Sequence, residues 1–408
     1  MTKLKASILL SILILYSGCV KREESIPVNI PNNTITQNST PQNVITIPEY
    51  TTNSTPVIID NNSPFNNMNN YTTEVVNTRP SYTIPRSRYL GGAYRNNSKL
   101  KNFINMMVSK YNYDRYTLNT IFSTVSRDKD ALDKYNVFKK AKPSYQKADT
   151  IGSWDKYRAN FLTPSRINKG VAFWKRNLFY LNKAAQEYGV APEYIIGIIG
   201  VETNFGSYTG THSVMNALTT LAIEFKKRSK FFTGELESYL LMLRDEKLDP
   251  QQIKGSYAGA FGLSQFMPTA FRQHAVDFNN DGHIDLFNEA DAIGSIAKYF
   301  IERGKWNKRI PVAMKVQYNK RRFYGLTTGF NTNYSQRHLI SLGMRPTSNF
   351  FGYRGDVSLI KLSRYDRDEL WWGTKNFYAI TRYNPKDYYA MAVHQLAQAV
   401  KNAYFQRR

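Results

Sequence analysis

The stretch APEYIIGIIGVETNFG, residues 191–206, decides how the rest of the chain is interpreted. A proline directly before a periodic apolar run suits the first turn of a helix. The apolar positions then recur at steps of three and four, which places them on one helix face. That face is formed by Ile195, Ile198, Ile199 and Glu202. We therefore predict a helix that begins near Pro192 and carries a carboxylate at the end of its most apolar face.

Glu202 has no basic neighbour in the sequence, because no lysine or arginine lies between Lys183 and Lys226. Burial without a positive partner disfavours the ionised carboxylate and raises its pKa. A raised pKa is what a general acid needs to work near neutral pH. The alternative is a helix-end glutamate that points to solvent or caps a backbone group. The pattern alone leaves both interpretations open.

The region around this helix is mainly helical in pattern. A helix with Val171, Trp174, Leu178, Leu181, Ala185 and Tyr188 on one face is expected to stop at Gly189. The same period recurs over 236–243, 293–301 and 389–403, whereas 310–382 is glycine-punctuated and rich in tyrosine, phenylalanine and threonine. The predicted fold class is α+β, mainly helical, with a small strand- and loop-rich segment.

The segment 277–285 reads DFNNDGHID. Oxygen-bearing side chains at positions 1, 3, 5 and 9, with glycine at 6, match the start of an EF-hand calcium loop. Position 12 is Asn288 instead of the usual glutamate, with Glu289 and Asp291 just beyond. The alternative is an Asn/Asp/Gly turn that binds no metal.

The N-terminal part predicts export. The apolar run from Leu4 to Tyr16 is shorter than the roughly 20 residues that cross a bilayer and has Lys3 and Lys5 at its start, as in a secretory signal peptide. Ser17, Gly18 and Cys19 follow this run and resemble the lipobox of bacterial lipoproteins, although Tyr16 stands where that motif usually has an aliphatic residue. A signal peptide cut nearby, with a stray thiol, is the alternative.

Composition sets further limits. Of residues 26–85, 36 of 60 are Asn, Thr, Ser or Pro, which predicts a disordered linker. We expect a signal peptide over 1–18, an anchor cysteine and linker over 19–95, and a globular domain over 96–408. The formal charge is +24, and one cysteine excludes an intramolecular disulfide. A nucleic-acid partner conflicts with export, and the five scattered histidines form no zinc-like pair.

Several motifs in order carry a family resemblance. They are IIGVETNFG ending at Gly206, GELES from Gly234, GSYAGAFGLSQFMP from Gly255 to Pro268, the calcium-like loop with DAIGS from Asp291, and ITRYN from Ile380 to Asn384. Together they resemble lytic murein transglycosylase B, over roughly Asn102 to Phe405. The resemblance implies a lysozyme-like core that cleaves the β-1,4 bond between N-acetylmuramic acid and N-acetylglucosamine in peptidoglycan.

The resemblance also implies a mechanism and a site. Glu202 would protonate the glycosidic oxygen and then act as base on the muramoyl 6-hydroxyl, which leaves a 1,6-anhydro sugar. Substrate contacts would be Ser256, Gln265, Phe266, Tyr157, Lys227, Arg228, Tyr299, Tyr383, Asn384 and Tyr389. A single, structural calcium would be held by Asp277, Asn279, Asp281, His283 (through its carbonyl), Asp285 and Asp291. Lys227 replaces a familiar arginine and cannot make a bidentate contact with a carboxylate. For Ser256 and Gln265 the alternative is a loop-stabilising role, and for the tyrosines it is ordinary packing.

Two other functions remain open at this stage. A hydrolysing muramidase would need a second carboxylate facing Glu202. A catalytically silent peptidoglycan tether, anchored at Cys19, would lose nothing when Glu202 is replaced. The expected setting is the periplasm of a Gram-negative bacterium, with a lipid anchor in the outer membrane, and with peptidoglycan glycan strands as the partner.

Overall fold

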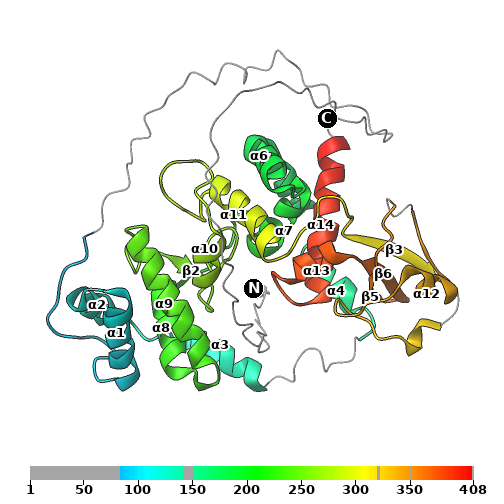
Figure 1. Cartoon of the computed structure of the whole chain (residues 1–408). Coiled ribbons are helices and arrows are strands. Elements are labelled where there is room, and N and C mark those ends of the chain that lie inside the picture. The colour runs from blue at the N-terminus through cyan, green and yellow to red at the C-terminus, as the bar shows by residue number, and fades with distance from the viewer. Residues whose placement is uncertain (1–82, 141–149, 319–321, 349–351, 407–408) are drawn as a thin grey trace, which may run out of the picture. The chain divides into compact units, whose positions relative to one another are not determined.

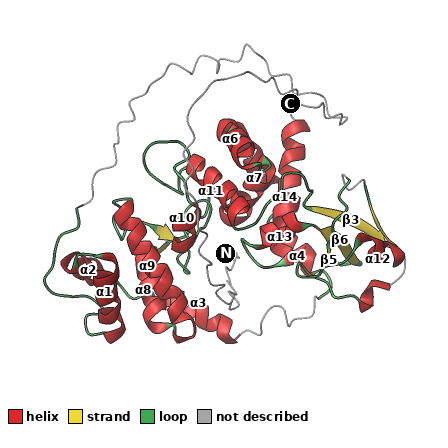
Figure 2. Cartoon of the chain, viewed as in Figure 1, coloured by secondary structure: helices red, strands yellow, loops and turns green. Residues whose placement is uncertain are grey.

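The computed structural model describes residues 83–140, 150–318, 322–348 and 352–406. The predicted signal peptide, Cys19 and most of the predicted linker lie outside these residues. The helices are α1 (Ser98–Tyr111), α2 (Arg115–Ser123), α3 (Lys129–Lys140), α4 (Ser153–Arg158), α5 (Pro164–Arg176), α6 (Leu178–Tyr188), α7 (Pro192–Thr203), α8 (Val214–Glu224), α9 (Ser229–Asp245), α10 (Pro268–His274), α11 (Glu289–Glu302), α12 (Gln336–Ser341), α13 (Lys375–Thr381) and α14 (Asp387–Gln406), with short 3₁₀ turns η3 (Lys226–Arg228) and η4 (Arg322–Gly325). The strands are β1 (His212–Ser213), β2 (Lys254–Gly255), β3 (Ala313–Tyr318), β4 (Met344–Pro346), β5 (Ser358–Ser363) and β6 (Asp368–Gly373). The mainly helical α+β class is confirmed, as Figure 2 shows.

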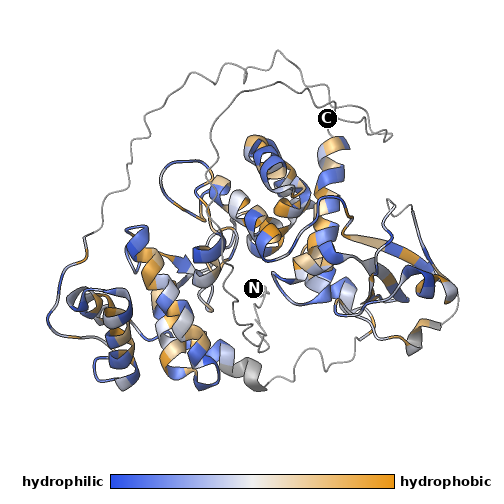
Figure 3. Cartoon of the chain, viewed as in Figure 1, coloured by the Kyte–Doolittle hydropathy of each residue, from blue (hydrophilic) through white to orange (hydrophobic). Residues whose placement is uncertain are grey.

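The helix predicted from residues 191–206 is α7. Pro192 occupies its first turn, and Asn204 ends it in the left-handed conformation with φ 50°. Every residue from Glu193 to Thr203 is buried, so the helix is enclosed on all sides instead of on the one predicted face. The reason is that α5, α6, α11 and α14 all pack against it. Figure 3 shows apolar residues along this helix.

The continuous helix expected over 171–188 is wrong. The structure divides it into α5 and α6, with the break at Asn177. The Asn177 amide Nδ2 donates to the Phe173 carbonyl at 3.1 Å and to a carboxylate oxygen of Glu289 at 2.5 Å. The backbone leaves helical geometry at this residue, with φ −110° and ψ 20°, and an asparagine side chain that bonds to the backbone is known to favour such breaks. The expected stop at Gly189 is confirmed, because this residue caps α6 with φ 66°.

The strand-rich segment predicted over 310–382 is also confirmed. Four antiparallel strands pair in the order β4-β3-β6-β5, with Met314 and Leu359 both opposite Trp372. A small core of its own lies on this sheet and includes Val316, Leu370 and Trp372. The predicted helices over 236–243, 293–301 and 389–403 are parts of α9, α11 and α14.

The packed domain includes residues before position 96. The Arg86 guanidinium pairs with Asp114 at 2.7 Å, and the buried Tyr94 donates its hydroxyl to Glu224 at 2.6 Å. The end of the region assigned to the linker therefore packs on α2 and α8. Among the residues that the structure describes, none of the helices has the length and apolar character that spanning a membrane requires.

The contact between α7 and α14, visible in Figure 1, sets the position of the candidate site. It depends on Gly197, where an added Cβ would lie 2.8 Å from the Val393 carbonyl oxygen and 3.2 Å from a Val393 methyl carbon. At Gly200 an added Cβ would lie 2.7 Å from Leu396. The two helix backbones therefore approach each other more closely than side chains at these positions would permit.

We expect Gly197→Ala to lower the free energy of unfolding by about 1–3 kcal/mol, because the added methyl group meets backbone that must shift. Urea denaturation measures this change. The matched control is Gly234→Ala in α9, where nothing lies within 4 Å of the added Cβ. That variant is expected to be neutral or slightly stabilising, since alanine is the better helix former. Equal effects of the two substitutions would contradict the close approach.

Candidate active site

Glu202 lies in the last turn of α7 and is only 6% exposed. The Tyr389 hydroxyl, from the first turns of α14, donates a hydrogen bond to Glu202 Oε1 at 2.5 Å. Two segments 187 residues apart are thus joined at the carboxyl group. The alternative that Glu202 points to solvent is wrong.

Burial raises the pKa of Glu202 to about 7, and the hydrogen bond from Tyr389 opposes this rise. Within the described residues, neither a basic side chain nor a second carboxylate contributes to this pKa. The carboxyl group is therefore partly protonated near neutral pH, and burial is the cause. A group in this state can both give and take a proton.

An aromatic wall surrounds the carboxyl group. Burial raises the pKa values of Tyr157, Tyr383 and Tyr389, and the charge of Glu202 raises them further. The same two causes contribute to raising the pKa of Tyr299 to about 12. These hydroxyls therefore stay protonated and can donate hydrogen bonds. We call Glu202, Tyr157, Tyr299, Tyr383, Tyr389 and Phe266 the Glu202 cluster.

Phe266 holds part of this wall together. Its ring centroid lies 5.5 Å from that of Tyr299 and 5.9 Å from that of Tyr383, and the two tyrosine rings are 4.8 Å apart. The Tyr383 hydroxyl donates to the Ser264 carbonyl at 2.9 Å, and the Tyr299 hydroxyl donates to the Arg382 carbonyl at 2.7 Å. Both rings are therefore fixed in orientation.

The glycine-rich segment 255–268 brings Ser256 and Gln265 into one compact loop. Ser256 donates its backbone N–H to the Ala260 carbonyl at 2.7 Å and accepts the Ala260 N–H on its hydroxyl at 3.1 Å. Gln265 is left-handed, with φ 50°, and its Nε2 donates to the carbonyls of Thr209 and Gly262, each at 3.0 Å. These contacts stabilise the loop, and the hydrogen of the Ser256 hydroxyl can still be donated to a ligand.

The remaining predicted substrate residues fall into two groups. Asn384 directly follows Tyr383, is 2% exposed, and its Oδ1 accepts no hydrogen bond in the structure. Lys227 and Arg228 lie in η3 between α8 and α9, where Lys227 is exposed and Arg228 covers the Phe231 ring at 4.1 Å. They belong to a different set of elements from those that carry the Glu202 cluster.

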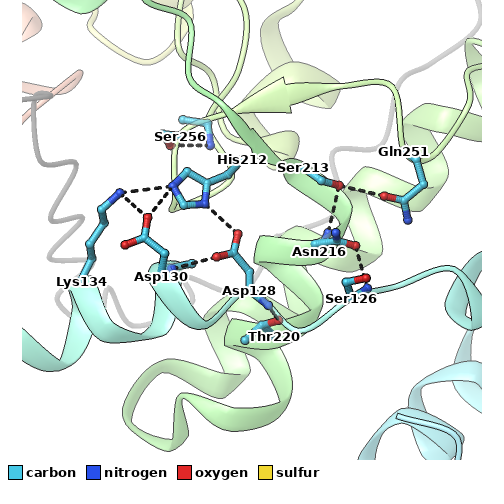
Figure 4. Close-up of polar contacts among 12 residues, drawn as sticks. Ser126, Asp128, Asp130, Lys134, His212, Ser213, Asn216, Thr220, Gln251 and Ser256 are labelled. Carbon is cyan, nitrogen blue, oxygen red and sulfur yellow. Dashed lines mark hydrogen bonds and ion pairs between the residues drawn. The ribbon is translucent and has the colours of Figure 1, made fainter. Parts of the chain in front are cut away.

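A histidine–aspartate pair lies near Ser256, as Figure 4 shows. His212 Nδ1 contacts Asp128 at 2.7 Å, while its Nε2 lies 3.2 Å from both Asp130 and Lys134 Nζ. Both ring nitrogens are therefore engaged, which leaves neither to activate the Ser256 hydroxyl as a nucleophile. His212 pairs with Gly255 across β1 and β2, so the pair positions the strand that leads into Ser256.

The predicted metal loop carries oxygen donors that suit a hard cation, but its carboxylates accept hydrogen bonds from N–H groups of the same loop. Asp277 accepts the N–H groups of Asp281 and Gly282 at 3.1 and 2.8 Å, and Asp281 accepts the N–H of His283 at 2.9 Å. The sharp turn at Gly282 has φ 84°. Oxygen donors in this order fit calcium. In the described part of the chain, however, no three His, Cys, Asp or Glu side chains stand close enough together to hold an ion.

Asp291 closes the loop from α11. It is fully buried, and its two carboxylate oxygens accept N–H groups from Phe278 at 2.8 Å and Asp285 at 2.7 Å. Burial nevertheless raises its pKa to about 6. This arrangement makes Asp291 a residue that holds the two ends of the loop together.

Sequence reasoning missed three contributors to the site. The Thr209 carbonyl binds Gln265, His212 supports the Ser256 strand, and Arg166 binds Asn204 directly after α7. No local pattern could identify them, because each acts through a partner that is distant in sequence or through its backbone. The whole arrangement offers one buried carboxyl group for proton transfer, surrounded by aromatic faces suited to a sugar.

Residues 95–398 match the family model described as Transglycosylase SLT domain. Over 314 residues the chain is 43% identical to the membrane-bound lytic murein transglycosylase B of Escherichia coli K12, which covers 76% of this chain and 85% of that protein. The E. coli lytic transglycosylase Slt35, solved in complex with calcium, has a TM-score of 0.71 at 41% identity and covers 80% of this chain and 99% of its own. SltB3 of Pseudomonas aeruginosa, in complex with NAG-anhNAM-pentapeptide, has a TM-score of 0.64 at 26% identity. The match covers 74% of this chain and 79% of the SltB3 chain. The matched residues include the entire Glu202 cluster.

Proposed function

The chain belongs to the transglycosylase SLT family and has the lysozyme-like fold of lytic transglycosylases that act on peptidoglycan, and from this premise we propose that Glu202 performs both proton transfers of the reaction. The observation that carries the proposal is one buried carboxyl group whose pKa is raised to about 7. Such a group is a competent acid at neutral pH and becomes a base once it has given up its proton.

The steps balance without water. Glu202 donates its proton to the glycosidic oxygen, and the bond from that oxygen to C1 of the muramoyl residue breaks. The N-acetylglucosamine side leaves as an alcohol, while the Tyr389 hydroxyl stabilises the new carboxylate. The carboxylate then takes the proton from the muramoyl 6-hydroxyl as O6 bonds to C1. Glu202 ends protonated, and the product is a 1,6-anhydro sugar.

A hydrolytic muramidase is disfavoured by the surroundings of Glu202. Glycosidases that use water normally place a second carboxylate opposite the acid, at a separation of about 5–9.5 Å. In the ranges that the structure describes, no acidic side chain influences the pKa of Glu202. The 6-hydroxyl of the muramoyl residue can replace the water that a second carboxylate would activate. This supports the intramolecular reaction over hydrolysis.

Mass spectrometry of the fragments that the full chain releases from purified peptidoglycan tests the proposal. Anhydromuramoyl ends are expected. Reducing ends would establish a hydrolase instead. If the protein bound the wall but released no fragments, it would be the catalytically silent peptidoglycan tether.

The same proposal assigns sugar contacts to the polar and aromatic groups around Glu202. Ser256, Gln265 and Asn384 would supply hydrogen bonds, and Phe266 with Tyr157, Tyr299, Tyr383 and Tyr389 would supply the aromatic surface. The unsatisfied Asn384 Oδ1 supports this role, because a buried acceptor without a partner is costly unless a ligand satisfies it. Lys227 and Arg228 would contact peptide-bearing parts of the substrate farther from the cut.

We also propose that the loop over 277–285 binds one structural calcium ion, since Slt35 is described in complex with calcium. Asp277, Asn279, Asp281 and Asp285 would supply side-chain oxygens, His283 its carbonyl, and Asp291 would hold the loop. Binding would require the carboxylates to exchange their backbone partners for the ion. Its effect would be to stabilise the segment that leads into α11.

Calcium is expected to raise the melting temperature, because a ligand that binds only the folded state stabilises that state. At a ligand concentration of 100 times the Kd, the free energy of unfolding rises by about 2.7 kcal/mol. Differential scanning calorimetry in calcium and in a chelator measures the shift. Asp281→Asn should reduce it strongly. Asp366→Asn, which removes the same charge from an exposed turn, should leave it intact. A melting temperature that is the same with and without calcium would overturn the site.

For the cellular setting, we propose a periplasmic enzyme that is lipid-anchored at Cys19 in the outer membrane. The E. coli relative is named as membrane-bound. Two features of the sequence agree with this setting, namely the apolar run before Cys19 and the linker after it. A tether of this kind would confine cutting to wall within reach of the membrane.

Cys19→Ala is expected to move the protein from the membrane fraction to the soluble periplasmic fraction. The physical reason is that an acyl chain contributes about 0.8 kcal/mol of membrane affinity per buried methylene group. Cell fractionation and immunoblotting measure the shift, with Ser17→Ala as a conservative control. A Cys19→Ala protein that still fractionates with membranes would contradict the anchor.

A further inference from the structure

Arg166 is a charged side chain beside the catalytic helix that the proposed reaction does not use. It lies in the first turn of α5, and its Nε donates to Asn204 Oδ1 at 3.2 Å. Asn204 caps α7 two residues after Glu202. The guanidinium group is therefore fixed next to the helix end that carries the catalytic carboxyl group.

Arg166 has no acidic partner within the part of the chain that the structure describes. Its Nη1 is buried and makes no hydrogen bond. The Phe161 ring lies 5.1 Å from its Cζ, and burial lowers the pKa of Arg166. A buried guanidinium donor without an acceptor costs stability, and a bound anion removes that cost. The side chain is partly exposed as a whole, and a ligand that binds the buried Nη1 must displace the groups that cover it.

Lys169 adds a second cation, three residues along the same helix. Its Nζ donates to the Ser207 hydroxyl at 2.7 Å, which is again a neutral acceptor. Both cations thus contact the turn 204–209, where Asn204, Phe205 and Gly206 are all left-handed, with φ of 50°, 57° and 81°. The turn is held by two positive charges that it does not neutralise.

This turn also reaches the proposed sugar contacts. It begins at the end of α7 and continues to Thr209, whose carbonyl accepts the hydrogen bond from Gln265. Tyr208, which is 51% exposed, lies between these points, and its phenol raises the pKa of Arg166. On the other side, Phe161 connects Arg166 to Tyr157 of the Glu202 cluster, with ring centroids 5.1 Å apart. Arg166 is therefore linked to the Glu202 cluster through one intermediate, the Phe161 ring, and to Gln265 through the turn 204–209.

We propose that Arg166, assisted by Lys169, binds a free carboxylate of the stem peptide on a muramoyl residue near the cut. This inference rests on the proposed function. The glycan backbone itself is uncharged, whereas the stem peptides carry carboxylates. The structure leaves Nη1 of the planar guanidinium without an acceptor, and a guanidinium group can bind a carboxylate through two parallel donors. Arg166 then determines specificity for peptide-bearing wall, and the chemistry at C1 stays with Glu202.

The test compares kcat/KM on intact peptidoglycan and on the same glycan strands after an amidase has removed the stem peptides and the lactyl carboxylates that this frees have been converted to methylamides. Arg166→Gln is expected to lower kcat/KM about tenfold on the intact substrate, mainly through KM, and to change it little on the stripped strands. Arg166→Lys should be intermediate, because it keeps the charge but loses the two parallel donors. Lys175→Gln, which removes a charge from an exposed position of the same helix, should match the wild type on both substrates.

An equal loss on both substrates would overturn the proposal, because it would mean that Arg166 acts only by holding the turn after α7. Unchanged kinetics on both would overturn it as well. Melting temperatures of the variants show whether the fold is intact. If the wild type releases no anhydro ends, the proposed function fails separately. The comparison is then made as the binding of both strands to Glu202→Gln proteins with and without Arg166→Gln, and equal affinities would refute the carboxylate site.

Discussion

Glu202→Gln is expected to lower the release of anhydromuramoyl products by about 10³-fold or more, within or above the range for one general acid–base group. The loss is large because one carboxyl group would perform both proton transfers, and glutamine can perform neither. The side chains are nearly isosteric, and the amide oxygen can still accept the Tyr389 hydroxyl. Binding to peptidoglycan should therefore persist. Quantifying released fragments by mass spectrometry, beside a wall-sedimentation assay, separates the two.

The same substitution should stabilise the fold above neutral pH. The folded pKa of about 7 exceeds the ordinary value of 4.5, so ionisation is easier in the unfolded chain. Below pH 4.5 the carboxyl group is protonated in both the folded and the unfolded chain, so it does not change the free energy of unfolding. As the pH rises through 7, the buried carboxyl group lowers the free energy of unfolding of the wild type by about 3 kcal/mol at most. Urea denaturation at pH 5 and pH 8 measures this. A Glu202→Gln protein that is less stable than wild type at pH 8 would contradict the buried acid.

Tyr389→Phe is expected to lower kcat about tenfold or more and to shift its pH dependence. The Tyr389 hydroxyl stabilises the ionised form of Glu202, so its removal raises the pKa of that carboxyl group further. The wild-type kcat/KM should fall as pH rises above about 7, where the acid becomes ionised. In the variant this fall should occur at higher pH, while the maximal rate drops because the carboxylate formed during the reaction has lost its donor.

Pre-steady-state or steady-state rates between pH 5 and 9 measure both effects. Tyr378→Phe, at a 40% exposed tyrosine on α13, is the control and should keep the wild-type profile. A Tyr389→Phe enzyme with a lower rate but an unmoved pH profile would mean that Tyr389 contributes only to packing.

Much of this site follows from the sequence because its key helix is locally encoded. The proline, the apolar period and Glu202 in residues 191–206 are enough to place α7 and its carboxyl group. The break at Asn177 could not be predicted, because it depends on Glu289, 112 residues away. The partnership of Glu202 with Tyr389 has the same character. In a chain with 29 tyrosines, only the family resemblance singled out Tyr389, and only the structure brings it to 2.5 Å.

The same limit applies to Arg166. Its significance depends on the fact that, among the described residues, no acidic side chain pairs with it, and a sequence does not show which side chains lie near one another in three dimensions. The proposed calcium loop is the opposite case, since its residues are nearly consecutive and the sequence pattern can be recognised without knowledge of the fold. The structure adds the contribution of Asp291, which links the loop to α11.

The distance along the chain between Glu202 and Tyr389 has a consequence for the cell that makes this protein. In an unfolded chain Glu202 is a solvated glutamate with an ordinary pKa, so it is ionised at neutral pH and unable to protonate a glycoside. Its acidity changes only when α7 is enclosed and α14 docks across 187 intervening residues. A molecule in which α7 and α14 have not yet packed together therefore lacks the acid that cleavage would need.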